Sequence, residues 1–197
     1  MSYITELRSW MSPSHVDTDP RPAPEIGRPA PSSDRLRIPS SDGKHVVITF
    51  LRHCGCPFAE KTYLLFRSTA SANPNVRFIV ISHSDQASTD HWLEAVGGST
   101  PSNLEVIVDA ERTLYATWGL GVSSFWHVLS PGGLSAVFKL GREEGIWNRP
   151  TESGSRWQTS GSWAVDEEGI VRWGRVAERA DEIPDFVEAI KMMEANE

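Results

Sequence analysis

Two runs of apolar, mostly β-branched residues mark the centre of the chain. One covers residues 46–51 (VVITFL) and the other residues 76–82 (VRFIVIS). Such runs are typical of strands that are buried on both faces of a parallel sheet. Between them, apolar side chains recur at helical spacing from Pro57 until Asn73-Pro74 interrupts the pattern. The pattern therefore predicts a strand, a helix and a second strand, joined by a right-handed crossover.

The rest of the chain continues the alternation of helices and strands. The expected elements are a helix over 88–96, a strand over 104–108, a helix capped by Asp109 that runs to Trp118, a hairpin of strands over 162–166 and 170–173, and a C-terminal helix that begins at Pro184. Residues 121–161 are rich in Gly, Pro and Ser, which predicts a long irregular segment, and such segments are usually functional or mobile. The fold class is therefore α/β, with a central mixed β-sheet flanked by helices.

The N-terminal 41 residues have a different character. Prolines recur between residues 12 and 41 with Ser and charged residues between them, which excludes a long helix or a central strand there. A short helix is expected over residues 3–11. We therefore divide the chain into a Pro-rich N-terminal extension, 1–41, and one domain, 42–197, and expect the extension to be an arm on the domain or a linker.

Composition narrows the functional classes. With 197 residues and 39% hydrophobic residues the chain can build one domain with a sizeable core. Its net charge of -7 disfavours nucleic acid as a partner. No apolar run approaches the roughly 20 residues that span a bilayer, and no signal peptide is recognisable. Two cysteines are too few for a secreted disulfide framework, so a cytoplasmic location is expected.

The chemistry is concentrated between the first strand and its helix, where the sequence reads Arg52-His53-Cys54-Gly55-Cys56-Pro57. Pro57 is a natural first helical residue, which makes Cys56 the N-cap. Backbone N–H groups and the positive end of the helix dipole then favour its thiolate, and Arg52 and His53 add positive potential. Because the thiolate is the nucleophile, Cys56 is the candidate for attack on a peroxide or a disulfide.

Cys54 allows two interpretations. Across Gly55 the two sulfurs could form a small strained disulfide, which would be labile. Alternatively Cys54, and less readily Cys56, is a small buried apolar residue without chemistry. No metal site is expected, because His53, Cys54 and Cys56 are too close in sequence to converge on an ion and no second ligand pair follows.

The strand VVITFLRH followed by Cys-Gly-Cys-Pro-Phe-Ala-Glu-Lys resembles the AhpC/TSA-type peroxiredoxin-like proteins of the thioredoxin superfamily. The resemblance continues through Val108-Asp109 and the runs 161–166 and 169–173, covering roughly residues 45–195, and the run 156–161 resembles fungal members in particular. It implies a thioredoxin-like fold and maps the first redox cysteine of the family onto Cys56.

The same resemblance shows where this chain departs from the family. The second cysteine of a thioredoxin-type pair is replaced by Ala59. The proline and threonine of the peroxiredoxin motif are replaced by Thr49 and His53. Arg156 is the candidate for a substitute cation near the substrate, on its position in the chain.

The leading hypothesis is a thiol-dependent oxidoreductase that needs no bound cofactor, with Cys56 as nucleophile and either Cys54 or an external thiol such as glutathione as the resolving group. The first alternative is a non-redox tailoring enzyme for a small aromatic metabolite. Its pocket would come from residues 121–161, including Trp126 and Trp157, with His53 or His127 as acid or base. The second is a binding module that retains only the fold. We expect a small-molecule peroxide, disulfide or aromatic metabolite as partner, no membrane, and a homodimer as one assembly that the sequence allows.

Overall fold

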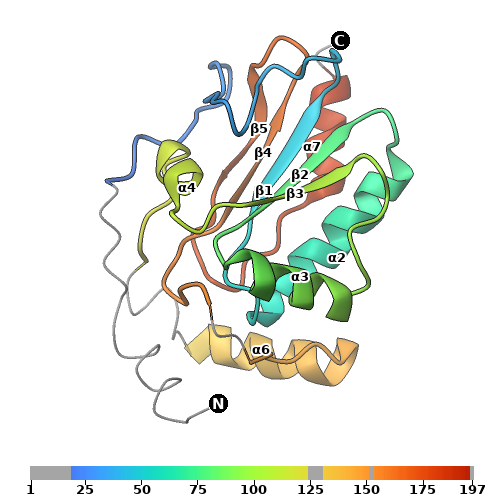
Figure 1. Ribbon diagram of the computed structural model, residues 1–197. Helices are drawn as coiled ribbons and strands as arrows, with labels where there is room; N and C mark the ends of the chain where they lie inside the picture. Colours follow the sequence, from blue (N-terminus) through green and yellow to red (C-terminus); the bar gives the residue numbers. More distant parts are fainter. Residues whose placement is uncertain (1–18, 124–130, 151–152, 196–197) are drawn as a thin grey trace.

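The computed structural model describes residues 19–123, 131–150 and 153–195, so the short helix expected over 3–11 lies outside the described residues. Its centre is one sheet of five strands in the order β3-β2-β1-β4-β5. The strands are β1 (Val46–Phe50), β2 (Arg77–Ser82), β3 (Leu104–Val108), β4 (Gly161–Val165) and β5 (Val171–Val176). β1, β2 and β3 are parallel, while β4 runs antiparallel to β1 and to β5 (Figure 1). The mixed α/β sheet expected from the sequence is thus confirmed.

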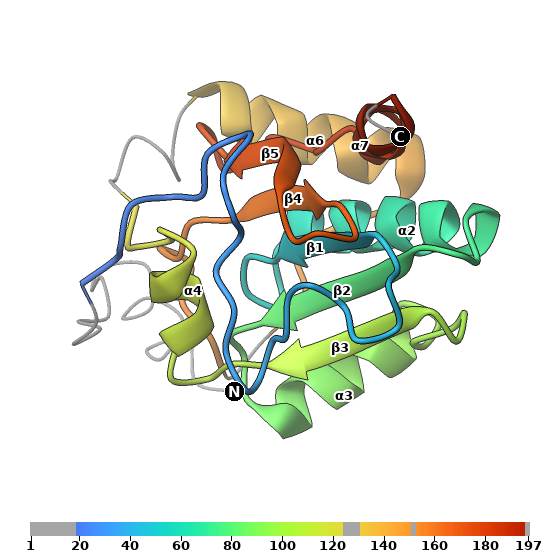
Figure 2. The ribbon, with the colours of Figure 1, turned by 90° about the horizontal axis from the view of Figure 1, so that it is seen from above.

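Helices and the N-terminal extension cover the two faces of this sheet differently. The described helices are α2 (Pro57–Ala72), α3 (Gln86–Ala95), α4 (Thr113–Thr117), α6 (Pro131–Glu144) and α7 (Phe186–Glu194). Side chains of α2, α3 and α7 form one core with one face of the sheet. Side chains of α4 and the extension form a second core on the other face (Figure 2). The sheet is therefore enclosed on both faces.

The continuous apolar character of β1 follows from this double burial. All five residues of β1 are buried. Val47 contributes to the core beneath α2, whereas Ile48 and Phe50 contribute to the core beneath α4. Successive side chains of a strand point to opposite faces, so a strand covered on both sides is mostly apolar. Its one polar residue, Thr49, is buried with its hydroxyl 2.8 Å from that of Ser162.

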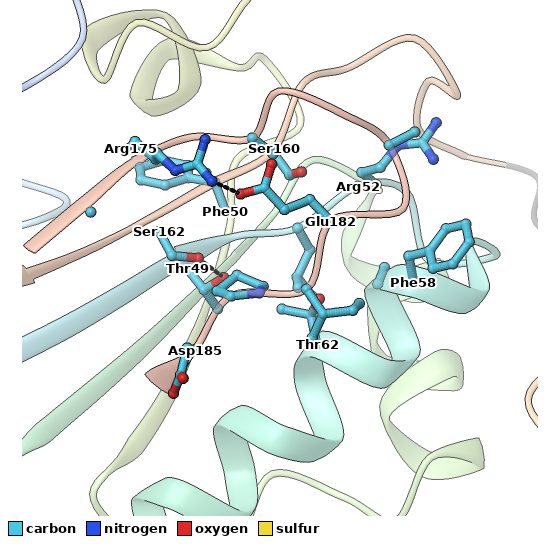
Figure 3. Close-up of a pocket in the computed structure, with 18 of the residues that line it drawn as sticks. Thr49, Phe50, Arg52, Phe58, Thr62, Ser160, Ser162, Arg175, Glu182 and Asp185 are labelled. Carbon is cyan, nitrogen blue, oxygen red and sulfur yellow. Dashed lines mark hydrogen bonds and ion pairs between the residues drawn. The ribbon is translucent and has the colours of Figure 1, made fainter. Parts of the chain in front are cut away.

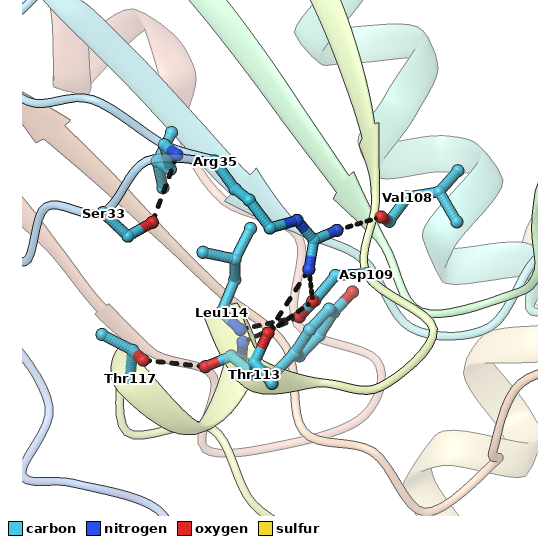
Figure 4. Close-up of polar contacts among 9 residues, drawn as sticks. Ser33, Arg35, Val108, Asp109, Thr113, Leu114 and Thr117 are labelled. Carbon is cyan, nitrogen blue, oxygen red and sulfur yellow. Dashed lines mark hydrogen bonds and ion pairs between the residues drawn. The ribbon is translucent and has the colours of Figure 1, made fainter.

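Residues 19–41 lie along the domain as an arm. Leu36 and Ile38 are buried in the second core, and no described residue of this segment belongs to a helix or a strand longer than an isolated bridge. Arg35 pairs with the buried carboxylate of Asp109 at 2.7 Å and donates to the carbonyl oxygen of Val108 (Figure 4). These contacts favour the arm over the linker among the two interpretations of the extension.

Three expectations about local structure were wrong. Asp109 is not the N-cap of α4, which begins at Thr113 after Arg112, although its carboxylate accepts the N–H groups of Leu114 and Tyr115. The segment 121–161 was expected to be irregular, but it contains the 14-residue helix α6, whose Ala136, Val137 and Leu140 pack against the first core. Packing of an apolar stripe outweighs the poor helix propensity of the two glycines near its start. The C-terminal helix begins after Pro184, because Asp185 is its N-cap and accepts two backbone N–H groups. No described helix combines the length and apolarity that crossing a membrane requires.

Candidate functional site

The cysteine turn lies where β1 ends and α2 begins. Cys56 is the N-cap of α2 and has extended backbone geometry, with Pro57 following it as the first helical residue. The N–H groups of Gly55 and Cys56 both donate to the carbonyl oxygen of His53, at 2.8 and 3.0 Å, and this bonding tightens the turn. The Cys56 side chain makes no capping hydrogen bond to the helix backbone and is 3% exposed. The helix N-terminus predicted for Cys56 is therefore present, with the thiol held below the surface.

Arg52 is the cation at the Cys56 sulfur. Its Nη1 donates to Sγ of Cys56 at 3.4 Å, and its Nη2 donates to the carbonyl oxygen of Arg156. Arg52 is only 6% exposed, and within the described ranges no carboxylate pairs with it. Arg156 was expected to supply a cation near the substrate. Its backbone oxygen accepts a hydrogen bond from Arg52, and the charge of its own side chain acts on the buried His53.

Cys54 has different partners from Cys56. Its sulfur lies 3.4 Å from the hydroxyl of Ser82 at the end of β2 and 3.8 Å from the hydroxyl of Thr89 in α3. Its backbone N–H donates to the hydroxyl of Ser84. Both cysteines are buried free thiols. The two sulfurs are thus held by separate sets of neighbours.

Residues that follow α6 in the chain, among them Arg149 and Gly154, contact the cysteine turn and the start of α2. The N–H of Arg149 donates to the carbonyl oxygen of Gly55, and its guanidinium binds both carboxylate oxygens of Glu60 in the first turn of α2, at 2.7 and 2.9 Å. Further along, a Cβ on Gly154, whose φ is +85°, would meet the hydroxyl of Ser84 at 2.7 Å and Cβ of His53 at 3.0 Å. Nothing in the local sequence marks Arg149 or Glu60, because their pairing depends on the path of α6.

Two buried histidines, His53 and His83, lie beside Gly154. Burial lowers the pKa of His83 from 6.5 to about 3. Its Nε2 accepts the N–H of Ser155 at 3.0 Å, and its Nδ1 lies 3.4 Å from the hydroxyl of Tyr115. Burial, together with the charges of Arg52 and Arg156, lowers the pKa of His53 well below 6.5. Both rings are therefore neutral near pH 7.

A pocket of about 390 Å³ lies on the β4–β5 side of the cysteine turn. Arg52, Phe58 and Ala59, which surround Cys56 in the chain, form part of its wall. Figure 3 shows Phe58 on one side and the ion pair between Arg175 and Glu182 on the other. Cavities of this size accommodate small organic ligands. The pocket thus reaches residues that flank Cys56 in the chain, while Cys56 itself is not among its lining residues.

The aromatic pocket expected from residues 121–161 is described only in part. Trp126 and His127 lie outside the described residues. Trp157 is buried and does not line the pocket described above. Among the described residues of the segment 121–161, Ser160 and Gly161 contribute to that pocket. Its other lining residues come from the arm, β1 and the turn after it, α2, β4, β5, the segment that leads into α7, and α7 itself.

Comparison with protein families gives the identity of the fold and of the family. The family model described as AhpC/TSA antioxidant enzyme matches residues 65–179. The chain belongs to this family. The match begins after the cysteine turn, so the roles of Cys54 and Cys56 rest on the geometry described above. No curated protein matches the chain significantly.

Solved structures of other proteins resemble the fold of this AhpC/TSA family member. A peroxiredoxin-like protein from Aquifex aeolicus is 15% identical, with a TM-score of 0.56 and 89% of each chain covered. A thiol peroxidase from Chromobacterium violaceum is 14% identical, with a TM-score of 0.56 and 91% of each chain covered. A yeast mitochondrial 1-Cys peroxiredoxin is 15% identical, with a TM-score of 0.54 over 87% of this chain and 76% of that one. At these identities the likeness concerns the fold.

Proposed function

We propose that the protein is a thiol-dependent oxidoreductase in which Cys56 is the nucleophile and a small peroxide is the substrate. The observation that carries the proposal is the contact between the buried guanidinium of Arg52 and the sulfur of Cys56 at the start of α2. A buried charge is costly unless it is paired. The Cys56 thiolate is the counter-charge that this arrangement favours.

The burial of Cys56 supports a small peroxide over a protein disulfide as the substrate. A thiol that is 3% exposed, with Arg149 and Arg156 bonded to the residues around it, is accessible to a small molecule but not to a folded protein disulfide. The pocket that reaches Arg52, Phe58 and Ala59 supports an approach from that side. A hydroperoxide is small enough to reach a thiol that is buried in this way.

The chemistry is a two-electron oxidation of sulfur. The Cys56 thiolate attacks the terminal oxygen of the hydroperoxide, an S–O bond forms, and the O–O bond breaks with its electron pair on the leaving alkoxide. The alkoxide takes up the proton that the thiol released on ionising, so the products are Cys56 sulfenic acid and an alcohol. Arg52 stabilises the anionic sulfur before attack.

The resolving group is an external thiol such as glutathione. Cys54 is held by Ser82 and Thr89, and a Cys-x-Cys disulfide would also need dihedral angles near the limits of disulfide geometry. One external thiol condenses with the sulfenic acid and releases water, and a second releases Cys56 as the free thiol with formation of the external disulfide.

Intact-protein mass spectrometry after one equivalent of hydrogen peroxide, with and without glutathione, tests this function. We expect gain of one oxygen without glutathione, one glutathione adduct with it, and neither in Cys56→Ser. Loss of two hydrogens under both conditions, abolished in Cys54→Ser, would make Cys54 the resolving group. No mass change under either condition would refute the oxidoreductase.

The pocket supports a second candidate, a non-redox enzyme for a small aromatic molecule. Phe58 and Trp173 line the pocket, which is large enough for a ring system. This candidate requires an inert Cys56. Reaction of Cys56 with peroxide would support the oxidoreductase, whereas binding of an aromatic ligand that is unchanged in Cys56→Ser would support the non-redox enzyme.

A further inference from the structure

The pocket on the β4–β5 side of the molecule has walls that the proposed function does not use. Its floor is the sheet face that carries Thr49 of β1 and Ser162 of β4. Apolar surface comes from Phe58 of α2, Trp173 of β5 and Ile183 before α7 (Figure 3). A cavity of about 390 Å³ with two aromatic side chains in its wall accommodates a molecule that contains a ring.

Two carboxylates lie at the start of α7 on the rim of this pocket. Asp185 is the N-cap of α7, and Glu188 is in its first turn on the same side of the helix. Both residues line the pocket and are exposed, and neither forms an ion pair within the described ranges. Arg175, which also lines the pocket, is already paired with Glu178 and Glu182. The rim therefore carries negative charge that no neighbouring cation offsets.

One oxygen of each carboxylate has no donor among the described residues. The N–H groups of Val187 and Glu188 both donate to Oδ1 of Asp185, at 3.0 Å, so Oδ2 stays open. The indole N–H of Trp173 donates to Oε2 of Glu188 at 3.2 Å, so Oε1 stays open. An anion is disfavoured here, because Asp185 already occupies the N–H groups at the start of α7 that an anion would use. An ammonium group, with its three N–H donors, suits the two open oxygens.

The floor of the pocket adds a buried polar group. The hydroxyls of Thr49 and Ser162 lie 2.8 Å apart, and the two residues are only 0% and 3% exposed (Figure 3). Because one hydroxyl donates to the other, the hydrogen of the accepting hydroxyl is left without an acceptor in the part of the chain that the structure describes. Buried polar groups are nearly always hydrogen-bonded. An oxygen atom of a ligand would complete the pair.

We propose that this pocket is a second ligand site, which binds a small aromatic amine that carries a hydroxyl group. The ammonium group donates to the open oxygens of Asp185 and Glu188, the ring lies in the apolar part of the pocket, and the hydroxyl oxygen accepts from the pair of Thr49 and Ser162. The inference goes beyond the reaction with peroxide and does not rest on it, because Cys56 is not a lining residue of the pocket.

Isothermal titration calorimetry of the whole protein with three probes tests both polar contacts. Tyramine has the ammonium and the hydroxyl group, 3-(4-hydroxyphenyl)propionate has a carboxylate in place of the ammonium, and phenethylamine lacks the hydroxyl. We expect tyramine to bind at least about 10-fold more tightly than the propionate, because attraction to two carboxylates is replaced by repulsion. It should bind about 2- to 10-fold more tightly than phenethylamine, the effect of one hydrogen bond.

Matched variants connect the affinities to the named groups. Asp185→Asn keeps a helix cap and Glu188→Gln keeps an acceptor oxygen. Each should weaken tyramine about 2- to 5-fold, the effect of losing one exposed ion pair. Glu194→Gln makes the same change of charge at an exposed position of α7 outside the pocket, and should bind tyramine as the wild type does. In the double variant Thr49→Val and Ser162→Ala, tyramine and phenethylamine should bind equally.

The indole N–H signal of Trp173 in nitrogen NMR reports where tyramine binds, because this group lines the pocket and donates to Glu188. We expect it to shift and to saturate in the wild type and in Cys56→Ser alike, while the signal of Trp118, which is outside the pocket, stays. No tyramine binding, or binding that is equal for the propionate and unchanged in Asp185→Asn and Glu188→Gln, would overturn the site while the reaction of Cys56 with peroxide stands. Equal affinities for tyramine and phenethylamine in the wild type would overturn the hydroxyl contact.

Discussion

Replacing Arg52 with methionine tests the contact on which the proposed function depends. Methionine keeps an unbranched apolar stem where Arg52 lines the pocket and removes the guanidinium. The substitution deletes the donor 3.4 Å from the Cys56 sulfur and the donor to the Arg156 carbonyl oxygen. Arg52→Lys keeps the charge but not the planar fork that reaches both acceptors.

The expected magnitude follows from the loss of a charged hydrogen bond. Such bonds contribute about 1.5–3 kcal/mol, and each 1.4 kcal/mol is a factor of about ten in rate. Arg52→Met should therefore lower the second-order rate of Cys56 oxidation about 10- to 100-fold, and Arg52→Lys should lie between. Two effects on the free energy of unfolding oppose each other in Arg52→Met. The variant gains stability because it no longer buries a charge, and it loses stability because the Arg156 carbonyl oxygen is left unpaired. The net change should stay below about 2 kcal/mol.

The assay is stopped-flow oxidation by hydrogen peroxide. Arg175→Met is the matched control, because Arg175 lines the same pocket but pairs with Glu178 and Glu182 at the surface. We expect slower oxidation in Arg52→Met and an unchanged rate in Arg175→Met. A folded Arg52→Met that oxidises as fast as the wild type would refute the reasoning that Arg52 activates Cys56.

Three further predictions concern stability and use urea unfolding. Tyr115→Phe should lower the free energy of unfolding by about 1–3 kcal/mol, because the hydroxyl donates to backbone carbonyls at the ends of both β1 and β2; an unchanged value would contradict this bonding. Leu36→Ala should lower it by about 2–5 kcal/mol, since Leu36 is buried in the second core; no loss would mean that the arm is not part of the folded core. Stability should fall as the pH drops from about 6.5 towards 3, because the unfolded chain protonates His83 at its ordinary pKa of 6.5 while burial holds the folded pKa at about 3. The contribution at pH 5 is at most about 2 kcal/mol, and His83→Asn should flatten the profile relative to wild type.

The sequence by itself determined the features that depend on local pattern. Mostly apolar runs specified β1 and β2 as strands buried on both faces, because neither face of a doubly covered strand is turned to solvent. Pro57 fixed the start of α2 and with it the place of Cys56, because a proline at the first helical position leaves the preceding residue as the cap. These constraints act within a few residues and can be read without knowing the fold.

The tertiary structure decided which distant groups meet. Arg52 bonds the backbone of Arg156, 104 residues away in sequence, and the same Arg52 side chain donates to the sulfur of Cys56. Cys54 faces Ser82 and Thr89 because β2 and α3 pass beside the turn. Helix α6 forms although its first turn contains two glycines, since burial of its apolar stripe outweighs local propensity. Such contacts depend on the path of the whole chain, and local sequence carries no record of that path.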